Sequence, residues 1–270
     1  MGCCGSKNKY DEDYRNNDRS QVDKLEQLSN INDYKSSGQL GNDKSTIQSL
    51  QQSQQAENPT SAFQIISNTN KSQVLEKYED YPDDPDNMVS YGIILSMEGK
   101  NKEAEAQLKK AVQKDSERAR SWQAYAELYE RQNDQQKALE IYGEGYKHSS
   151  PKIALDGDDS NLLLNYAINL YKAKDFEKAE KLFKRVITSG PKSAEACGRY
   201  AIFLLKVNQD KAKAETYFQE AANMEPPNAI WNQRYAEFCK HFLKDEEKAS
   251  IYFKRSSLYQ QQQGNSSRRN

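Results

Sequence analysis

Between positions 119 and 152 the apolar residues twice follow the period of an α-helix, and this stretch constrains the fold most. The first helical face holds four residues at spacings i, i+3, i+4 and i+7: Trp122, Tyr125, Ala126 and Tyr129. Asn133 and Asp134 interrupt this pattern. A second face follows with Ala138, Tyr142 and Gly145. The stretch therefore predicts two antiparallel helices that meet at small residues, with the Trp122 and Tyr142 rings filling the space where they diverge.

The same helix pair recurs along the chain at a nearly constant spacing. A tyrosine followed by a small residue marks each first helix: Tyr91-Gly92, Tyr125-Ala126, Tyr166-Ala167, Tyr200-Ala201 and Tyr235-Ala236. An alanine followed four positions later by a bulky residue marks each second helix, at Ala104, Ala138, Ala179, Ala214 and Ala249. Successive tyrosines are 34, 41, 34 and 35 residues apart, and five unrelated helix pairs would not keep this register.

These residues resemble the tetratricopeptide repeat family, whose pattern is W-x-x-L-G-x-x-Y, then A-x-x-x-F, then A and P. The resemblance covers residues 85–258. It implies an all-α fold, a right-handed α-solenoid of about five helix pairs, in which the first helix of each pair lines a concave, peptide-binding wall.

Composition divides the chain into five segments. The whole chain is 36% apolar, but residues 8–58 are rich in Gln, Asn, Ser and Asp and hold too few apolar residues to form a core. We expect an acylation signal at 1–7, a disordered tether at 8–58, a capping helix at 59–84, five repeats at 85–258 and a disordered tail at 259–270.

The first residues match a lipidation signal. Gly2 with Ser6 fits the M-G-x-x-x-[ST] pattern for N-myristoylation, and Cys3 and Cys4 beside it are candidates for palmitoylation. One myristoyl chain gives membrane binding of only about 10⁴ M⁻¹, so a stable anchor needs a second signal. The alternative is an ordinary N-terminus that happens to begin with glycine. Dual acylation predicts attachment to the cytoplasmic face of a plasma, ciliary or internal membrane.

Several other classes of function find no support in the sequence. It holds no phosphate-binding loop, nucleophile elbow or metal-ligand pair, so we expect no enzyme, cofactor, metal site or small-molecule substrate. The net charge of −1 predicts no general attraction to nucleic acid. No apolar run reaches 18 residues, so we expect no membrane-spanning helix. Cys197 and Cys239 are expected to be buried free thiols.

Irregularities between the repeats are expected to form loops. Residues 153–159 are an insertion whose acidic residues lack the twelve-residue frame of a calcium loop. Asp158 or Ser160 is expected to cap the following helix. Repeats four and five each hold one extra residue between their helices, within 206–210 and 243–246.

The wall of repeats three and four is apolar by register, which predicts a groove for a partner peptide. Its candidate contacts are Leu164, Ile168, Tyr171, Arg199, Ile202 and Arg234, the arginines holding an acidic flank of the ligand. The alternative is that these side chains pack against neighbouring helices. The lysines of the carboxylate clamp that chaperone-binding members of the family use are missing.

Two functions compete. The first is a membrane-tethered adaptor that binds a protein or peptide partner in its groove. The second is a scaffold of an RNA-processing complex, because Trp122, Tyr125 and Glu130 are similar to the half-a-tetratricopeptide repeats of such complexes. The acylation signal and the lack of a basic surface favour the first.

Overall fold

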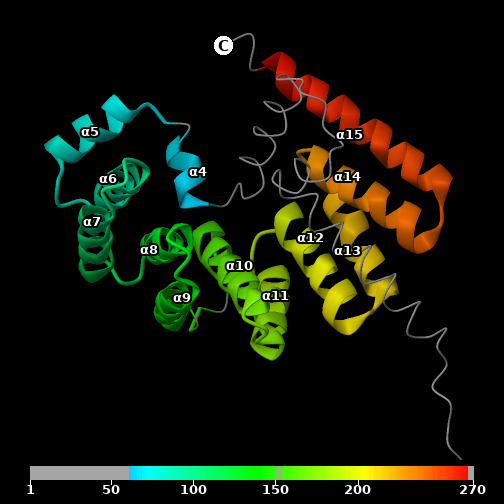
Figure 1. The fold of residues 1–270 in the computed structure, drawn as a ribbon, viewed down its shortest axis with the longest axis horizontal. Coiled ribbons are helices and arrows are strands. Elements are labelled where there is room, and N and C mark those ends of the chain that lie inside the picture. Colours follow the sequence, from blue (N-terminus) through cyan, green and yellow to red (C-terminus); the bar gives the residue numbers. More distant parts are fainter. Residues whose placement is uncertain (1–60, 68, 150, 153, 267–270) are drawn as a thin grey trace, which may run out of the picture. The chain divides into compact units, whose positions relative to one another are not determined.

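The computed structural model describes residues 61–67, 69–149, 151–152 and 154–266 (Figure 1). Every regular element within these ranges is a helix, which confirms the all-α prediction. The predicted acylation signal at 1–7 and the predicted tether at 8–58 lie outside the described residues. The chain divides into two compact units between Ala196 and Cys197, and each unit is considered by itself.

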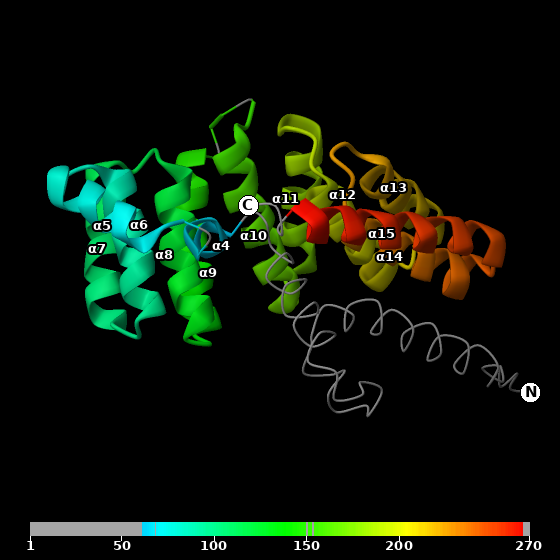
Figure 2. The ribbon, with the colours of Figure 1, turned by 90° about the horizontal axis from the view of Figure 1, so that it is seen from above.

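Three helix pairs follow one another in the unit that ends at Ala196. They are α6 (Pro85–Met97) with α7 (Asn101–Lys114), α8 (Ala119–Arg131) with α9 (Gln135–Ser149), and α10 (Gly157–Lys172) with α11 (Phe176–Ser189). Each helix packs against the next in sequence order, as Figure 2 shows from above. The repeat alanines of the second helices, Ala104, Ala138 and Ala179, have no exposed surface, as their spacing predicts.

The other unit continues the pattern with two further pairs. They comprise α12 (Ala194–Phe203) with α13 (Lys211–Asn223), and α14 (Ala229–Phe238) with α15 (Glu246–Ser266). Trp231 is 1% exposed and lies against Gly198, where even a methyl group would overlap the indole ring. Gly198 is therefore needed for its lack of a side chain.

All five turns within the helix pairs share one backbone conformation. The same repeat position has a positive φ in every pair, at Gly99, Asn133, Lys174, Gln209 and Lys244. In the last four repeats an aspartate follows, and its carboxylate accepts the backbone N–H three residues on, at Asp134, Asp175, Asp210 and Asp245. A left-handed residue thus ends the first helix, and an aspartate caps the second.

The extra residues of repeats four and five do not lengthen the turns, contrary to expectation. The first helices of these repeats instead end in π-helical turns, η1 (Leu204–Asn208) and η2 (Cys239–Leu243). The N–H of Asp210 accordingly donates to the carbonyl of Leu204, six residues back. The equivalent Asp175 donates to Leu170, only five residues back. Widening the last turn absorbs one residue and leaves the tight turn unchanged.

The insertion before repeat three is closed by an ion pair. Lys152 Nζ lies 2.8 Å from a carboxylate oxygen of the buried Asp159. The helix cap is Asp156, whose side chain accepts the N–H of Asp159 at 2.8 Å. The predicted caps, Asp158 and Ser160, are therefore wrong, because α10 already begins at Gly157.

The two ends of the described chain also differ from expectation. Residues 59–84 were predicted to hold one capping helix, but α4 (Ala62–Ser67) and α5 (Lys71–Asp80) both lie there. Both helices pack against α6. At the other end α15 continues to Ser266, so residues 259–266 are helical instead of forming a disordered tail. Glutamine is a good helix former, which accounts for this continuation through the Gln-rich stretch.

Candidate functional site

The short helix α4 covers part of the wall that the first helices of repeats one and two form. It packs against α6 and α8 and lies beside both in Figure 1. Ala62, Phe63 and Ile66 on α4 are buried. Val89 and Ile93 of α6, two positions before and two after Tyr91, are fully buried as well. A buried apolar face of α4 therefore packs on the wall that α6 and α8 form.

Glu127 of α8 is the polar centre of this contact. The hydroxyl of Ser61 donates to its carboxylate at 2.8 Å, and the backbone N–H groups of Ala62 and Phe63 each donate at 3.4 Å. From the repeats, Gln123 donates its side-chain amide at 2.7 Å and Asn165 at 3.4 Å. The carboxylate thus accepts donors from α8, from α10 and from the segment that begins α4.

The charge of Glu127 is poorly hydrated. The side chain is 6% exposed, and burial raises its pKa from the ordinary 4.5 to about 7, despite the donors that Gln123 and Ser61 supply. The nearby Glu130 raises this pKa further. An acid in this setting exchanges its proton near neutral pH.

The aromatic residue of α4, Phe63, lies against a cationic side chain of α8. The guanidinium of Arg131, one turn beyond Glu127 on α8, lies 4.8 Å from the centre of the Phe63 ring. This is within the range of a cation–π interaction. The α4 seat, defined here as the surface of α6 and α8 that α4 covers, with Glu127 and Arg131 of α8, therefore combines an acceptor and a cation.

A second polar cluster joins repeats two and three and is structural in character. Glu130 accepts the Tyr142 hydroxyl at 2.6 Å and the Asn169 amide at 2.8 Å, and Gln135 donates to Asn169 at 2.6 Å. Burial raises the pKa of Tyr142 well above its usual range, so this hydroxyl stays a donor. Such a satisfied network fixes one repeat on the next.

Three of the predicted groove residues lie on α10. Leu164 is 2% exposed and therefore part of the packing. Ile168 and Tyr171 are half-buried and keep some accessible surface. The Tyr171 ring also lies 6.0 Å from that of Phe176.

The other three predicted groove residues, Arg199, Ile202 and Arg234, belong to the second unit. Ile202 is 5% exposed and Arg199 is half-buried. Arg234 is 3% exposed, and its guanidinium lies 4.8 Å from the Trp231 ring centre. Arg234 is thus packed on an aromatic ring instead of facing solvent.

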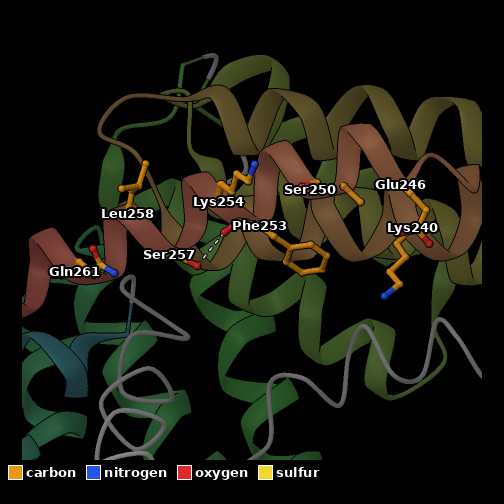
Figure 3. A pocket seen from close by; sticks show the side chains of 9 residues that line it. Lys240, Glu246, Ser250, Phe253, Lys254, Ser257, Leu258 and Gln261 are labelled. Atoms are coloured by element: carbon orange, nitrogen blue, oxygen red, sulfur yellow. Dashed lines mark hydrogen bonds between the residues drawn. The ribbon is translucent and has the colours of Figure 1, made fainter.

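An open depression lies along α15 in the same unit. Figure 3 shows Phe253 and Leu258 on this helix, with Lys240 and Glu246 at one end. Among the bulky residues that follow the repeat alanines of the second helices by four positions, Phe253 alone is half-exposed, whereas the others are buried. Leu258 is exposed. This is the side on which a further helix would pack in a longer array.

The described residues also bear on the expectations about membrane-spanning helices, metal sites and thiols. Within the described ranges, each helix is either too short or too polar to cross a lipid bilayer. The same ranges bring together no group of three His, Cys, Asp or Glu side chains suited to a metal ion. Cys197 and Cys239 are buried free thiols, as predicted. Burial raises the pKa of Cys239 to about 11, so this thiol is unreactive at neutral pH.

The α4 seat was missed in the sequence, although its parts were visible. Glu127 falls on the wall by register, and Phe63 and Ile66 have the i, i+3 spacing of a helical face. The one signal in the sequence for this site is a carboxylate at a wall position between apolar neighbours, because a buried carboxylate needs hydrogen-bond donors.

Stacked antiparallel helix pairs repeated about every 34 residues, with small residues where the helices meet, define an α-helical repeat protein. The sequence profile described as Tetratricopeptide repeat matches residues 98–152 and 164–229. A TPR repeat-containing protein of Dictyostelium discoideum is 45% identical over 219 residues, which is 78% of this chain and 81% of that protein. The chain therefore belongs to the tetratricopeptide repeat (TPR) family.

Solved structures share the fold at low sequence identity. The pilF protein of Pseudomonas aeruginosa superposes with a TM-score of 0.55 at 18% identity, over 73% of this chain and 88% of pilF. MamA of Desulfovibrio magneticus RS-1 gives a TM-score of 0.51 at 14% identity, over 66% of this chain and 96% of MamA. TPR folds are in general protein-interaction modules that bind protein or peptide partners.

Proposed function

We propose that this TPR protein is a membrane-tethered scaffold that collects a protein partner at the cytoplasmic face of a plasma, ciliary or internal membrane. The observation that carries the proposal is the pairing of a TPR body with an N-terminus in which Gly2, Cys3 and Cys4 stand together before Ser6. Myristate on Gly2 brings the chain to the membrane, and palmitate on the cysteines keeps it there.

The concave wall is the proposed binding surface, because first helices line it in repeat after repeat. Of the predicted contacts, Ile168, Tyr171 and Arg199 keep accessible surface, and they remain our candidates for direct contact with a partner peptide. Leu164, Ile202 and Arg234 are buried and would shape the wall by packing. No nucleic acid, cofactor or small-molecule substrate enters the proposal.

Affinity capture from membranes tests the proposal. The tagged chain is recovered from the membrane fraction after labelled fatty-acid feeding, and its partners are compared with those of Ile168→Glu. Loss of a partner at an unchanged melting temperature supports binding on the wall. The control is Ile251→Glu, on the exposed side of α15, which should keep that partner. A chain without label, or with the same partners in both variants, would contradict the proposal.

A further inference from the structure

We propose that the α4 seat is a peptide-binding site that the chain's own α4 occupies, and that a partner segment of the same chemistry displaces α4. The inference rests on the proposed function, because it adds a stretch of the wall on α6 and α8 to the partner contacts proposed above. It adds that α4 blocks the site until a competing segment displaces it.

The contacts of α4 resemble those of a bound peptide more than those of a repeat helix. Three apolar side chains face the wall, Phe63 lies under Arg131, and the first backbone N–H groups point at Glu127. An amphipathic helix that lays an apolar face with anchors at i and i+3 into a groove is typical of helix-in-groove recognition, and Phe63 and Ile66 have this spacing.

The contacts that hold α4 in place are weak enough for another segment to replace it. The helix has six residues, which is too short to be stable without the surface it lies on. Two of its three hydrogen bonds to Glu127 are 3.4 Å long, beyond the usual range for N–H···O bonds. Only the Ser61 hydroxyl makes a short one, at 2.8 Å. The helix α4 is not a member of any of the five helix pairs.

The seat defines the ligand it fits. A segment that fits the seat begins with a hydroxyl residue and a small residue whose N–H can donate to Glu127. An aromatic residue for Arg131 follows, and an aliphatic residue lies three positions later. This is the pattern of Ser61, Ala62, Phe63 and Ile66. A segment that begins with Asp or Glu is rejected, because its charge would face the Glu127 carboxylate. The partner is thus a short amphipathic helix without acidic residues in its first turn.

A labelled peptide of residues 59–69 provides the probe. In the full chain, Phe63→Asp with Ile66→Asp empties the seat, and we expect this variant to bind the peptide at least tenfold more tightly than the unchanged chain. Adding Glu127→Leu, which removes the acceptor, should weaken that binding at least tenfold. The matched control is Tyr81→Asp, on a side chain that is 68% exposed, which should bind like the unchanged chain. Equal binding by all variants, or binding unaffected by Glu127→Leu, would overturn the proposal.

Hydrogen exchange on the unchanged chain covers the case in which the double variant fails to fold. Saturating peptide should speed exchange of the α4 amides at least tenfold while α8 stays protected. Unchanged α4 exchange at high peptide concentration contradicts the proposal. If the peptide fails but partner capture from membranes persists, only this inference falls. If the peptide binds but no partner is captured, the proposed function falls instead.

Discussion

The hydroxyl of Ser61 donates to the carboxylate of Glu127 at 2.8 Å, although 66 positions of the chain separate the two residues. This bond ties the segment before the first repeat to the second repeat, on the side where the first helices lie. Together with the Phe63 ring beneath Arg131, it turns part of the wall into an occupied site.

Glu127 should make stability depend on pH. Its pKa is raised from 4.5 to about 7 in the folded chain, mainly by burial, so the folded state favours the protonated acid. The stabilisation is complete below pH 4.5 and is lost as the pH rises to about 7, amounting to at most about 3 kcal/mol. Of the other described ionisable groups, Glu130 of α8 raises this pKa and Tyr142 of α9 interacts electrostatically with Glu127. Ser61, just before α4, and Asn165 of α10 donate a hydroxyl and an amide to it.

Urea unfolding at pH 5 and pH 7.5 measures this effect. The unchanged chain should lose more stability between the two pH values than Glu127→Gln, which cannot ionise. Glu79→Gln, on the exposed side of α5, serves as the control and should behave like the unchanged chain. The same loss in Glu127→Gln would show that the carboxylate does not titrate in this range.

The left-handed turn residues offer a stabilising change. Lys174 has φ 67° and Gln209 has φ 53°, conformations that cost a side-chain-bearing residue about 1 kcal/mol relative to glycine. Lys174→Gly and Gln209→Gly should therefore each raise the free energy of unfolding by about 0.5–1 kcal/mol. The converse change, Gly99→Ala at φ 79°, should lower it by about 1 kcal/mol. Destabilisation by both glycine changes would argue against strain at these turns.

The two tryptophans should differ in their contribution to stability. Trp231 is almost fully buried against Gly198, so Trp231→Ala should cost about 3–5 kcal/mol. Trp122 was expected to be buried between its helices, but it is half-buried and its ring stacks on that of His148. Trp122→Ala should cost less, about 2 kcal/mol. Equal melting temperatures for the two variants would contradict the burial difference.

Local spacing was sufficient to predict the helix pairs. Alanines such as Ala104 and Ala214 and aromatic residues such as Phe218 repeat at fixed positions, and all three are fully buried. The π-helical turns could not be predicted, because one extra residue can widen a helix or lengthen a loop. Packing of the neighbouring helices decides between the two.

The site was harder to predict than the fold, because it depends on contacts between distant segments. The spacing of Phe63 and Ile66 indicates a helical face, but it does not say which surface covers that face. Register placed Leu164 and Ile202 on an exposed wall, whereas both are buried. Exposure depends on how closely successive first helices approach, and a repeat period does not specify that distance.

Membrane fractionation of Gly2→Ala tests the central proposal most directly. The unchanged chain should pellet with membranes at low and high salt, because acyl chains are not displaced by ions. Gly2→Ala should be soluble, since palmitoylation of Cys3 and Cys4 follows the first contact made by myristate, and Cys3→Ser with Cys4→Ser should leave only weak, reversible binding. A Gly2→Ala chain that still pellets at both salt concentrations would contradict the acyl anchor on which the scaffold proposal depends.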